Sequence, residues 1–111
     1  MRNVKEIELA GKVCTIKLNN FAIATAEKQL GKSIMVVLQD GLGVEALHTL
    51  LYVGMKNYEP KLKMKEVYDL VDEAVEEKPE AYQELMELVL DLVLGALGLG
   101  AEEPEKKPTM E

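Results

Sequence analysis

The chain has 111 residues, enough for one domain with a small hydrophobic core. Because 48% of the residues are hydrophobic but only 5% are aromatic, aliphatic side chains and six Met must fill the interior. Residues 1–63 hold 9 basic and 6 acidic residues, residues 64–111 hold 4 and 14, and the formal net charge is −7. A duplex-binding domain needs a contiguous basic face, so this pattern argues against nucleic acid as a partner. The opposite charges of the two halves suggest ordered association with a partner or weak self-association.

Neither a membrane span nor a secretory signal is predicted. The sequence contains no uncharged apolar run of membrane-spanning length, and its first residues lack a basic-then-apolar pattern. We therefore expect a cytosolic protein that does not contact a membrane. The single cysteine, Cys14, cannot form an internal disulfide, and its place in an alternating apolar pattern predicts a packed thiol.

The first segments predict a β-hairpin. Val4–Leu9 and Val13–Leu18 alternate apolar and polar residues, and the Gly-containing connection Ala10–Lys12 joins them. An isolated hairpin is marginal in water, so its apolar face must lie on helices or pair with a second chain. That face comprises Ile7, Leu9, Cys14, Ile16 and Leu18.

Helix signals follow the hairpin. Asn19-Asn20 can cap a helix that ends near Gly31 and has apolar residues at helical spacing, namely Ile23, Ala26 and Leu30. Ser33 can cap a short segment that includes Ile34–Leu38. A short run of Ile and Val suits a buried strand equally well, so the state of residues 33–39 stays open.

Three longer helices are predicted after the break at Gly41-Leu42-Gly43. One runs from Val44 to about Lys56, and a polar elbow, Asn57–Leu62, separates it from a helix with an acidic side. Proline is favoured in a first helical turn, so we predict that the last helix starts at about Pro79. Its apolar pattern extends to Leu97. The apolar positions of the first two are Val44, Leu47, Leu51, Met55, Val67, Leu70, Val71 and Ala74.

The last helix has a wider apolar arc than one packing face requires. One side can pack on the preceding helix, through Tyr82, Leu85, Val89 and Val93, while a narrow acidic stripe comprises Glu80, Glu84, Glu87 and Asp91. We predict that the residues left on the flank bind a partner protein: Met86, Leu90, Leu94 and Leu97. The alternative is that all four are core in a tighter bundle or a homodimer.

No residue pattern predicts catalysis, a metal site or a cofactor site, and we expect a protein that is not an enzyme. His48 is the only histidine and lacks a nucleophile or further ligands at matching spacing. The acidic residues from Asp69 to Glu77 have helical spacing without the Gly-centred pattern of a calcium loop. Gly41-Leu42-Gly43 lacks the Gly-Lys-Ser/Thr ending of a phosphate loop and indicates an interhelical turn.

The fold class predicted from these elements is α+β and mostly α. We expect an N-terminal β-hairpin, then four to five helices in a small bundle, then a disordered C-terminal tail. Residues 1–97 would form a single domain, with the hairpin in residues 1–18 and the helices in residues 20–97. Residues 98–111, which are charged and contain two prolines, would be a flexible acidic tail.

The elbow and its two helices resemble the small tail assembly chaperones of long-tailed bacteriophages and gene transfer agents. In that family a helix ending in Leu-(Tyr/Trp)-Ala/Val-Gly-(Leu/Met) meets a short polar elbow, and the next helix reads Glu-Val-(Tyr/Gly)-(Asp/Glu)-Leu-(Val/Ile)-Asp. Here Leu51–Met55 and Glu66–Asp72 stand in those places. The resemblance covers about residues 6–95. One departure is Lys63, where relatives often have a capping Thr or Ser.

The resemblance implies a role in phage or prophage tail assembly. The protein would bind the tape measure protein and recruit tail tube subunits in the host cytoplasm, and it would be absent from the mature virion. The elbow would be structural, with Gly54 and Pro60 letting two helices fold back and present apolar surface. In many such phages a longer frameshifted product is also made. The alternative function is a small structural virion protein, such as a tail completion or connector subunit, retained in the particle.

Overall fold

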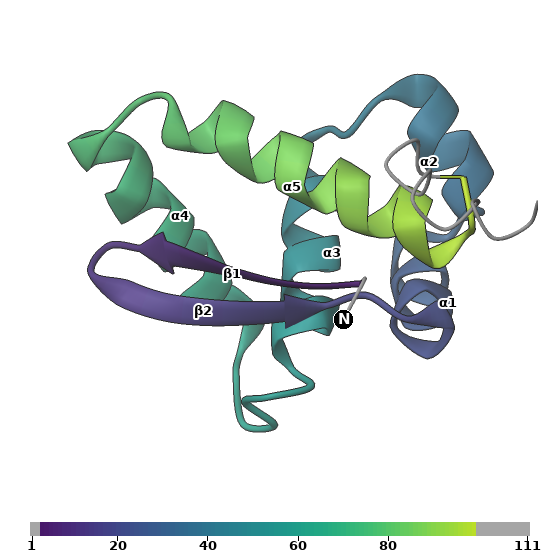
Figure 1. Ribbon diagram of the computed structural model, residues 1–111, viewed down its shortest axis with the longest axis horizontal. Helices are drawn as coiled ribbons and strands as arrows, with labels where there is room; N and C mark the ends of the chain where they lie inside the picture. Colours follow the sequence, from purple (N-terminus) through teal and green to yellow (C-terminus); the bar gives the residue numbers. More distant parts are fainter. Residues whose placement is uncertain (1–2, 100–111) are drawn as a thin grey trace, which may run out of the picture.

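The computed structural model describes residues 3–99 and confirms the predicted fold class: a two-stranded antiparallel hairpin followed by five helices (Figure 1). The elements are β1 (Val4–Leu9), β2 (Lys12–Lys17), α1 (Asn20–Leu30), α2 (Ile34–Asp40), α3 (Val44–Met55), α4 (Met64–Glu77) and α5 (Ala81–Ala96). In Figure 1 the hairpin lies in front of α3, and α5 runs along the top from α4 to the end of the molecule where α1 and α2 lie.

The hairpin turn is tighter than the sequence suggested. Leu9 pairs with Lys12, so the loop comprises two residues, Ala10 and Gly11, rather than three. Both have positive φ, 53° and 79°, which is the conformation of a type I′ turn and matches the twist of the strands. The prediction that Lys12 belongs to the connection is therefore wrong, and β2 begins one residue earlier than expected.

The apolar side of the hairpin packs on the helices, as predicted. Leu9, Cys14, Ile16 and Leu18 are buried, and Ile7 is partly buried against them. Burial raises the pKa of the Cys14 thiol, because a thiolate there would be desolvated. Cys14 is thus the packed thiol that the alternating pattern indicated.

Gly54 permits the close contact between β2 and α3. A Cβ at this position would lie 2.6 Å from Ile16 Cγ2, so a larger residue would force the Ile16 side chain or its strand to shift. Gly54 lies in the last turn of α3, inside the predicted helix. Besides the role in helix reversal that the resemblance implies, Gly54 thus lets strand and helix approach each other closely.

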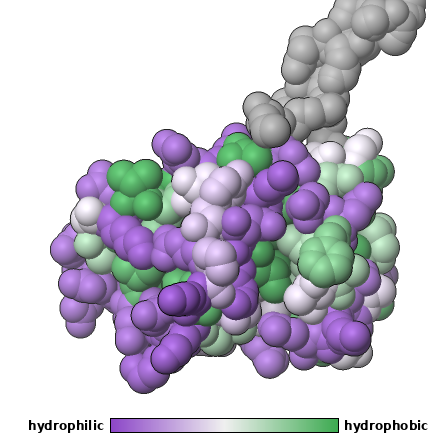
Figure 2. Space-filling model, turned by 90° about the horizontal axis from the view of Figure 1, so that it is seen from below, coloured by the Kyte–Doolittle hydropathy of each residue, from purple (hydrophilic) through white to green (hydrophobic). Residues whose placement is uncertain are grey.

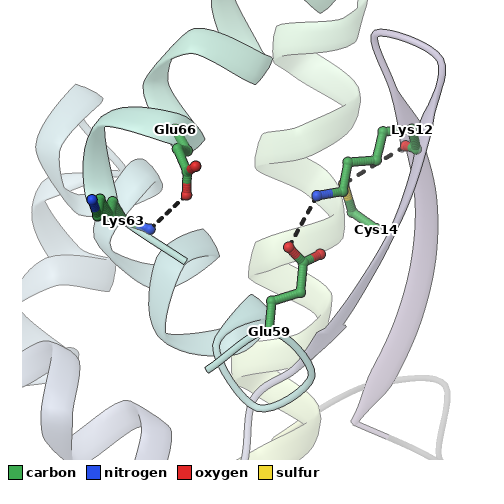
Figure 3. A network of polar contacts seen from close by, with 5 residues as sticks. All are labelled: Lys12, Cys14, Glu59, Lys63 and Glu66. Atoms are coloured by element: carbon green, nitrogen blue, oxygen red, sulfur yellow. Dashed lines mark hydrogen bonds and ion pairs between the residues drawn. The ribbon is translucent and has the colours of Figure 1, made fainter. Parts of the chain in front are cut away.

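The elbow between α3 and α4 is fastened to the hairpin. Asn57 Nδ2 donates to the Lys17 carbonyl at 2.9 Å, and the Lys12 ammonium lies 2.9 Å from a Glu59 carboxylate oxygen, a hydrogen bond that raises the Lys12 pKa (Figure 3). Within the elbow, Lys56 Nζ donates to the Pro60 carbonyl at 2.7 Å. These contacts join segments about 40 residues apart in sequence and fix the angle at which the two helices meet.

The start of α4 is capped despite Lys63. The Glu66 carboxylate accepts the Lys63 backbone N–H at 2.8 Å, and the Lys63 carbonyl accepts the Glu66 backbone N–H at 2.9 Å (Figure 3). This is half of a capping box, because the Lys63 ammonium group cannot be the side-chain acceptor that a Ser or Thr hydroxyl would be. Glu66 thus supplies part of the capping that Thr or Ser would give.

Residues 34–39 are helical and Ser33 is the N-cap of their helix, which resolves the open alternative. The Ser33 hydroxyl accepts the Val36 N–H at 3.3 Å, and the Glu27 carboxylate accepts the Ile34 N–H at 2.7 Å. The preceding helix α1 begins at an Asn19 cap and ends at Gly31 with φ 73°, as predicted. The two side-chain acceptors at the first turn of α2, Ser33 and Glu27, favour a helix over a strand there.

The centre of the core is α3, which contacts β2, α1, α4 and α5. Its predicted apolar positions Leu47, Leu51 and Met55 are buried, whereas Val44, predicted on the same line, is 58% exposed. Val44 is the first residue of α3 and precedes the part that the other elements enclose. On α4, Val67, Val71 and Ala74 are buried and Leu70 packs beside them.

Helix α5 starts two residues later than predicted and closes with an ordered cap. Pro79 lies in the turn before Ala81. At the other end, the Gly98 N–H donates to Gly95 and the Leu99 N–H donates to Leu94, with φ 76° at Gly98. This pair is a Schellman motif, so the first two residues assigned to the tail belong to the helix cap. The rest of the predicted tail lies outside the described residues.

Candidate partner-binding surface

The two sides of α5 differ sharply in burial. On the side facing the core, Leu85, Val89 and Val93 are completely buried, and Tyr82 is half-buried against them. These four residues were predicted to pack on the preceding helix, and three of them are core residues. The contacts of α5 with α3, α4 and β1 account for this burial.

The four predicted partner-binding residues lie on the other side, and none of them is fully buried. Leu90 is 39% exposed, while Met86, Leu94 and Leu97 are partly buried. Met86 and Leu97 still pack against the core, whereas Leu90 and Leu94 stand outside the packed apolar residues of the described chain. Leu90 and Leu94 are therefore the two of these four residues whose apolar surface a partner would cover most.

Met86 and Leu90 form one wall of an open groove between α5 and α2. The groove has a volume of about 300 Å³, and its other wall comes from Leu38, at the end of α2, and Leu42, in the turn before α3. We call it the α2–α5 groove. Leu94 and Leu97 do not line it, so the structure divides the predicted surface into a groove and a neighbouring flank.

The α2–α5 groove has an acidic rim. Glu87 lines it together with Gln83, whose amide donates to the Glu87 carboxylate at 3.4 Å. No basic side chain lines the groove within the part of the chain that the structure describes. An occupant would thus bury apolar side chains on Met86, Leu90, Leu38 and Leu42 and place positive charge near Glu87.

Sequence reasoning missed the α2 wall of this groove. Leu38 and Leu42 were assigned to an ambiguous segment and to an interhelical turn. Their place opposite Met86 and Leu90 depends on how α2 packs across the end of α5, which no local pattern encodes. The one available signal was the excess of apolar residues in both segments.

A second open groove lies between α1, α3 and the elbow. It has a volume of about 420 Å³, and Phe21, Thr25, Tyr52, Lys56 and Pro60 lie along it. Phe21, the only phenylalanine of the chain, is 80% exposed. No sequence pattern had singled out this residue, because its position in the first turn of α1 carries no periodic signal.

His48 is a packing residue between α3 and α4. Its Nδ1 lies 2.7 Å from the Val44 carbonyl, so that nitrogen donates, and its ring stacks on Tyr68 with centroids 4.0 Å apart and 3° between the planes. The other nitrogen, Nε2, is buried without a hydrogen-bond partner among residues 3–99. The ring is enclosed by side chains and opens onto neither groove.

Comparison with known proteins adds no relative: no protein-family model, curated protein or solved structure matches the chain. Over residues 3–99, no three His, Cys, Asp or Glu side chains gather as they would around a metal ion. In the same range, no helix has the length and apolar character to cross a membrane.

Proposed function

We propose that this protein is a tail assembly chaperone of a long-tailed phage or prophage, which binds the tape measure protein and recruits tail tube subunits in the host cytoplasm. The observation that supports the proposal most is the uncovered apolar side of α5, with Leu90 exposed beside the α2–α5 groove. The resemblance of Leu51–Met55 and Glu66–Asp72 to that family supplies the kind of partner.

The energetics suit a binding role. Burying one Leu or Met side chain contributes roughly 1.5–3 kcal/mol before the costs of association. Leu90, Leu94 and Met86 together thus form an anchor cluster large enough for an amphipathic helix, and Glu87 favours a helix with Lys or Arg beside its apolar stripe. The tape measure protein would supply that helix.

The test is co-expression with the tape measure protein of the same phage or prophage. The double variant Leu90→Glu/Leu94→Glu should stay folded by circular dichroism and fail to co-purify. Val13→Glu is the matched control for the single variant Leu90→Glu, because each adds one carboxylate, and Val13 is an apolar residue that is 63% exposed on the hairpin. Full binding by the double variant would refute the α5 site. Should the double variant unfold, the single variant Leu90→Glu decides the question.

A second measurement separates the chaperone from a structural virion protein. Mass spectrometry of purified particles should find the tape measure protein and the tail tube protein but not this chain. Its presence at a fixed ratio to the tube protein would contradict the chaperone role and favour a tail completion or connector subunit.

A further inference from the structure

The groove between α1, α3 and the elbow is a second surface with chemistry of its own. Side chains one helical turn apart line it from both helices: Phe21 and Thr25 from α1, and Tyr52 and Lys56 from the end of α3. Pro60, in the elbow, lines it as well. We call it the Phe21 groove. It shares no lining residue with the α2–α5 groove, so an occupant of one does not contact the other.

The Phe21 groove offers an apolar anchor. Phe21 is 80% exposed, and an aromatic side chain buries about 150–250 Å² when a partner covers it. Ala22 and Val53 also line the groove, so the hollow beside the ring is apolar. In Figure 2, which views the molecule from the elbow side, hydrophobic surface gathers at the right, where α1 lies, within a largely hydrophilic face.

The Phe21 groove also holds a positive charge in a fixed place. Lys56 Nζ donates to the Pro60 carbonyl at 2.7 Å and lies 5.6 Å from the centre of the Tyr52 ring. Both partners are uncharged, and no carboxylate lines the groove within residues 3–99. The position of this ammonium group is thus set before a partner arrives, which lowers the entropy cost of pairing it with an anion.

The elbow beside the groove adds to the positive charge. Residues 56–63 include three Lys and one Glu. That carboxylate, Glu59, already pairs with Lys12 of the hairpin at 2.9 Å. Lys61 and Lys63 are exposed, and neither lies within 4 Å of a carboxylate in the described part of the chain. The surroundings of the groove are therefore locally basic, although the net charge of the chain is −7.

We propose that the Phe21 groove binds a short acidic segment of a partner protein. An apolar side chain of that segment packs against Phe21 and Tyr52, and a carboxylate beside it pairs with Lys56. A basic segment, which suits Glu87 at the α2–α5 groove, would meet like charge here. The two grooves thus select partners of opposite charge. One anchor and one exposed ion pair make this contact weak.

The separation of the grooves lets the chain hold two partners at once. If the proposed function is right, the tape measure protein occupies the α2–α5 groove, and the acidic segment belongs to a second protein that the chain brings to it. This consequence rests on the proposed function, whereas the binding of an acidic segment at the Phe21 groove does not.

An amide NMR titration of the full chain tests the proposal. The probe is a short synthetic peptide in which Leu and Pro alternate with Glu, and its matched control has Lys in place of every Glu. At low salt the Glu peptide should shift the amide signals of Phe21, Tyr52 and Lys56, and added salt should weaken its binding because exposed charges are screened. The Lys peptide should leave these signals unchanged.

Variants separate the anchor from the charge. Phe21→Ala should weaken binding of the Glu peptide about tenfold or more, as expected for loss of an aromatic anchor. Lys56→Gln should weaken it about two- to fivefold, the range of an exposed ion pair. Lys56→Glu should reverse the preference toward the Lys peptide. Val13→Ala, an exposed change on the hairpin, should bind as the wild type does, and circular dichroism checks that every variant folds.

Several outcomes would overturn the inference. These are no shift of the three amides at millimolar Glu peptide, equal shifts with both peptides, or shifts confined to the α2–α5 groove. Equal binding of a short single-stranded DNA would make the surface a general polyanion site, and the same shifts on concentrating the chain alone would make a second copy the occupant. Phe21→Ala should still co-purify with the tape measure protein, which separates failure of this contact from failure of the proposed function.

Discussion

Helices α3 and α5 are both apolar around most of their circumference, yet they occupy opposite environments. The hairpin, α1, α4 and α5 enclose α3, which buries nine of its twelve residues. Helix α5 lies at the top of the molecule and buries five of sixteen. An apolar helix is thus core when neighbours surround it and keeps an uncovered apolar side when they cover only one side, so its surroundings decide its burial.

The largest effect on stability is expected in α3. Leu50→Ala removes a fully buried side chain in the middle of the core and should lower the free energy of unfolding by about 2–5 kcal/mol, from lost burial and the cavity left behind. Urea unfolding followed by circular dichroism measures the change. A loss below about 1 kcal/mol would mean that α3 is less enclosed than the comparison requires.

Glycine-to-alanine substitutions should have opposite effects on stability in α3 and α5. Gly54→Ala in α3 should cost about 1–2 kcal/mol, because overpacking against Ile16 outweighs the gain in helix propensity. Gly95→Ala in α5, where an added Cβ meets no atom of the described chain within 4 Å, should instead stabilise by about 0.5–1 kcal/mol.

The clash at Gly54 can be checked in a second background. In an Ile16→Ala protein, which lacks the opposing Cγ2 atom, Gly54→Ala should become neutral or stabilising in thermal unfolding. An unchanged cost in that background would assign the effect to another contact.

A smaller effect is expected at the start of α4. Lys63→Ser adds a hydroxyl that can accept a backbone N–H of the first turn and complete the capping box with Glu66, so the protein should gain about 1 kcal/mol in stability. Thermal unfolding measures the gain. Adding Glu66→Ala should cancel part of it, and equal stability of the single and double variants would show that Glu66 does not cap the helix.

The smallest effect is expected on the exposed side of α5. Leu90→Ala should change the free energy of unfolding by less than about 0.5 kcal/mol, because the side chain is 39% exposed and lies outside the core cluster. Leu85→Ala, on the buried side of the same helix, is the matched control and should cost about 2–5 kcal/mol. Equal losses in urea unfolding would make Leu90 a core residue.

The sequence predicted local features better than tertiary ones. Asn19, Ser33 and Gly31 marked helix ends because capping depends on a few adjacent residues. The buried side of α5 followed from its periodicity. By contrast, the second wall of the α2–α5 groove could not be predicted, because Leu38 and Leu42 meet Met86 only through tertiary packing.

Two residues have roles that local sequence does not reveal. Lys12 was assigned to the connection, although its backbone pairs with Leu9 and its ammonium group contacts Glu59. Gly54 makes room for Ile16, which is 38 residues earlier in the sequence. In both cases a long-range partner decides the role of the residue.

Methionine oxidation in the free protein and in its complex with the tape measure protein tests the central claim most directly. Peroxide converts exposed Met to the sulfoxide, and mass spectrometry gives the rate at each residue. Met86 should react in the free protein and be protected in the complex, while Met55, which is 1% exposed, should stay unreactive in both and Met35, which is 56% exposed, reactive in both. Equal Met86 oxidation in the free and bound protein would contradict the account.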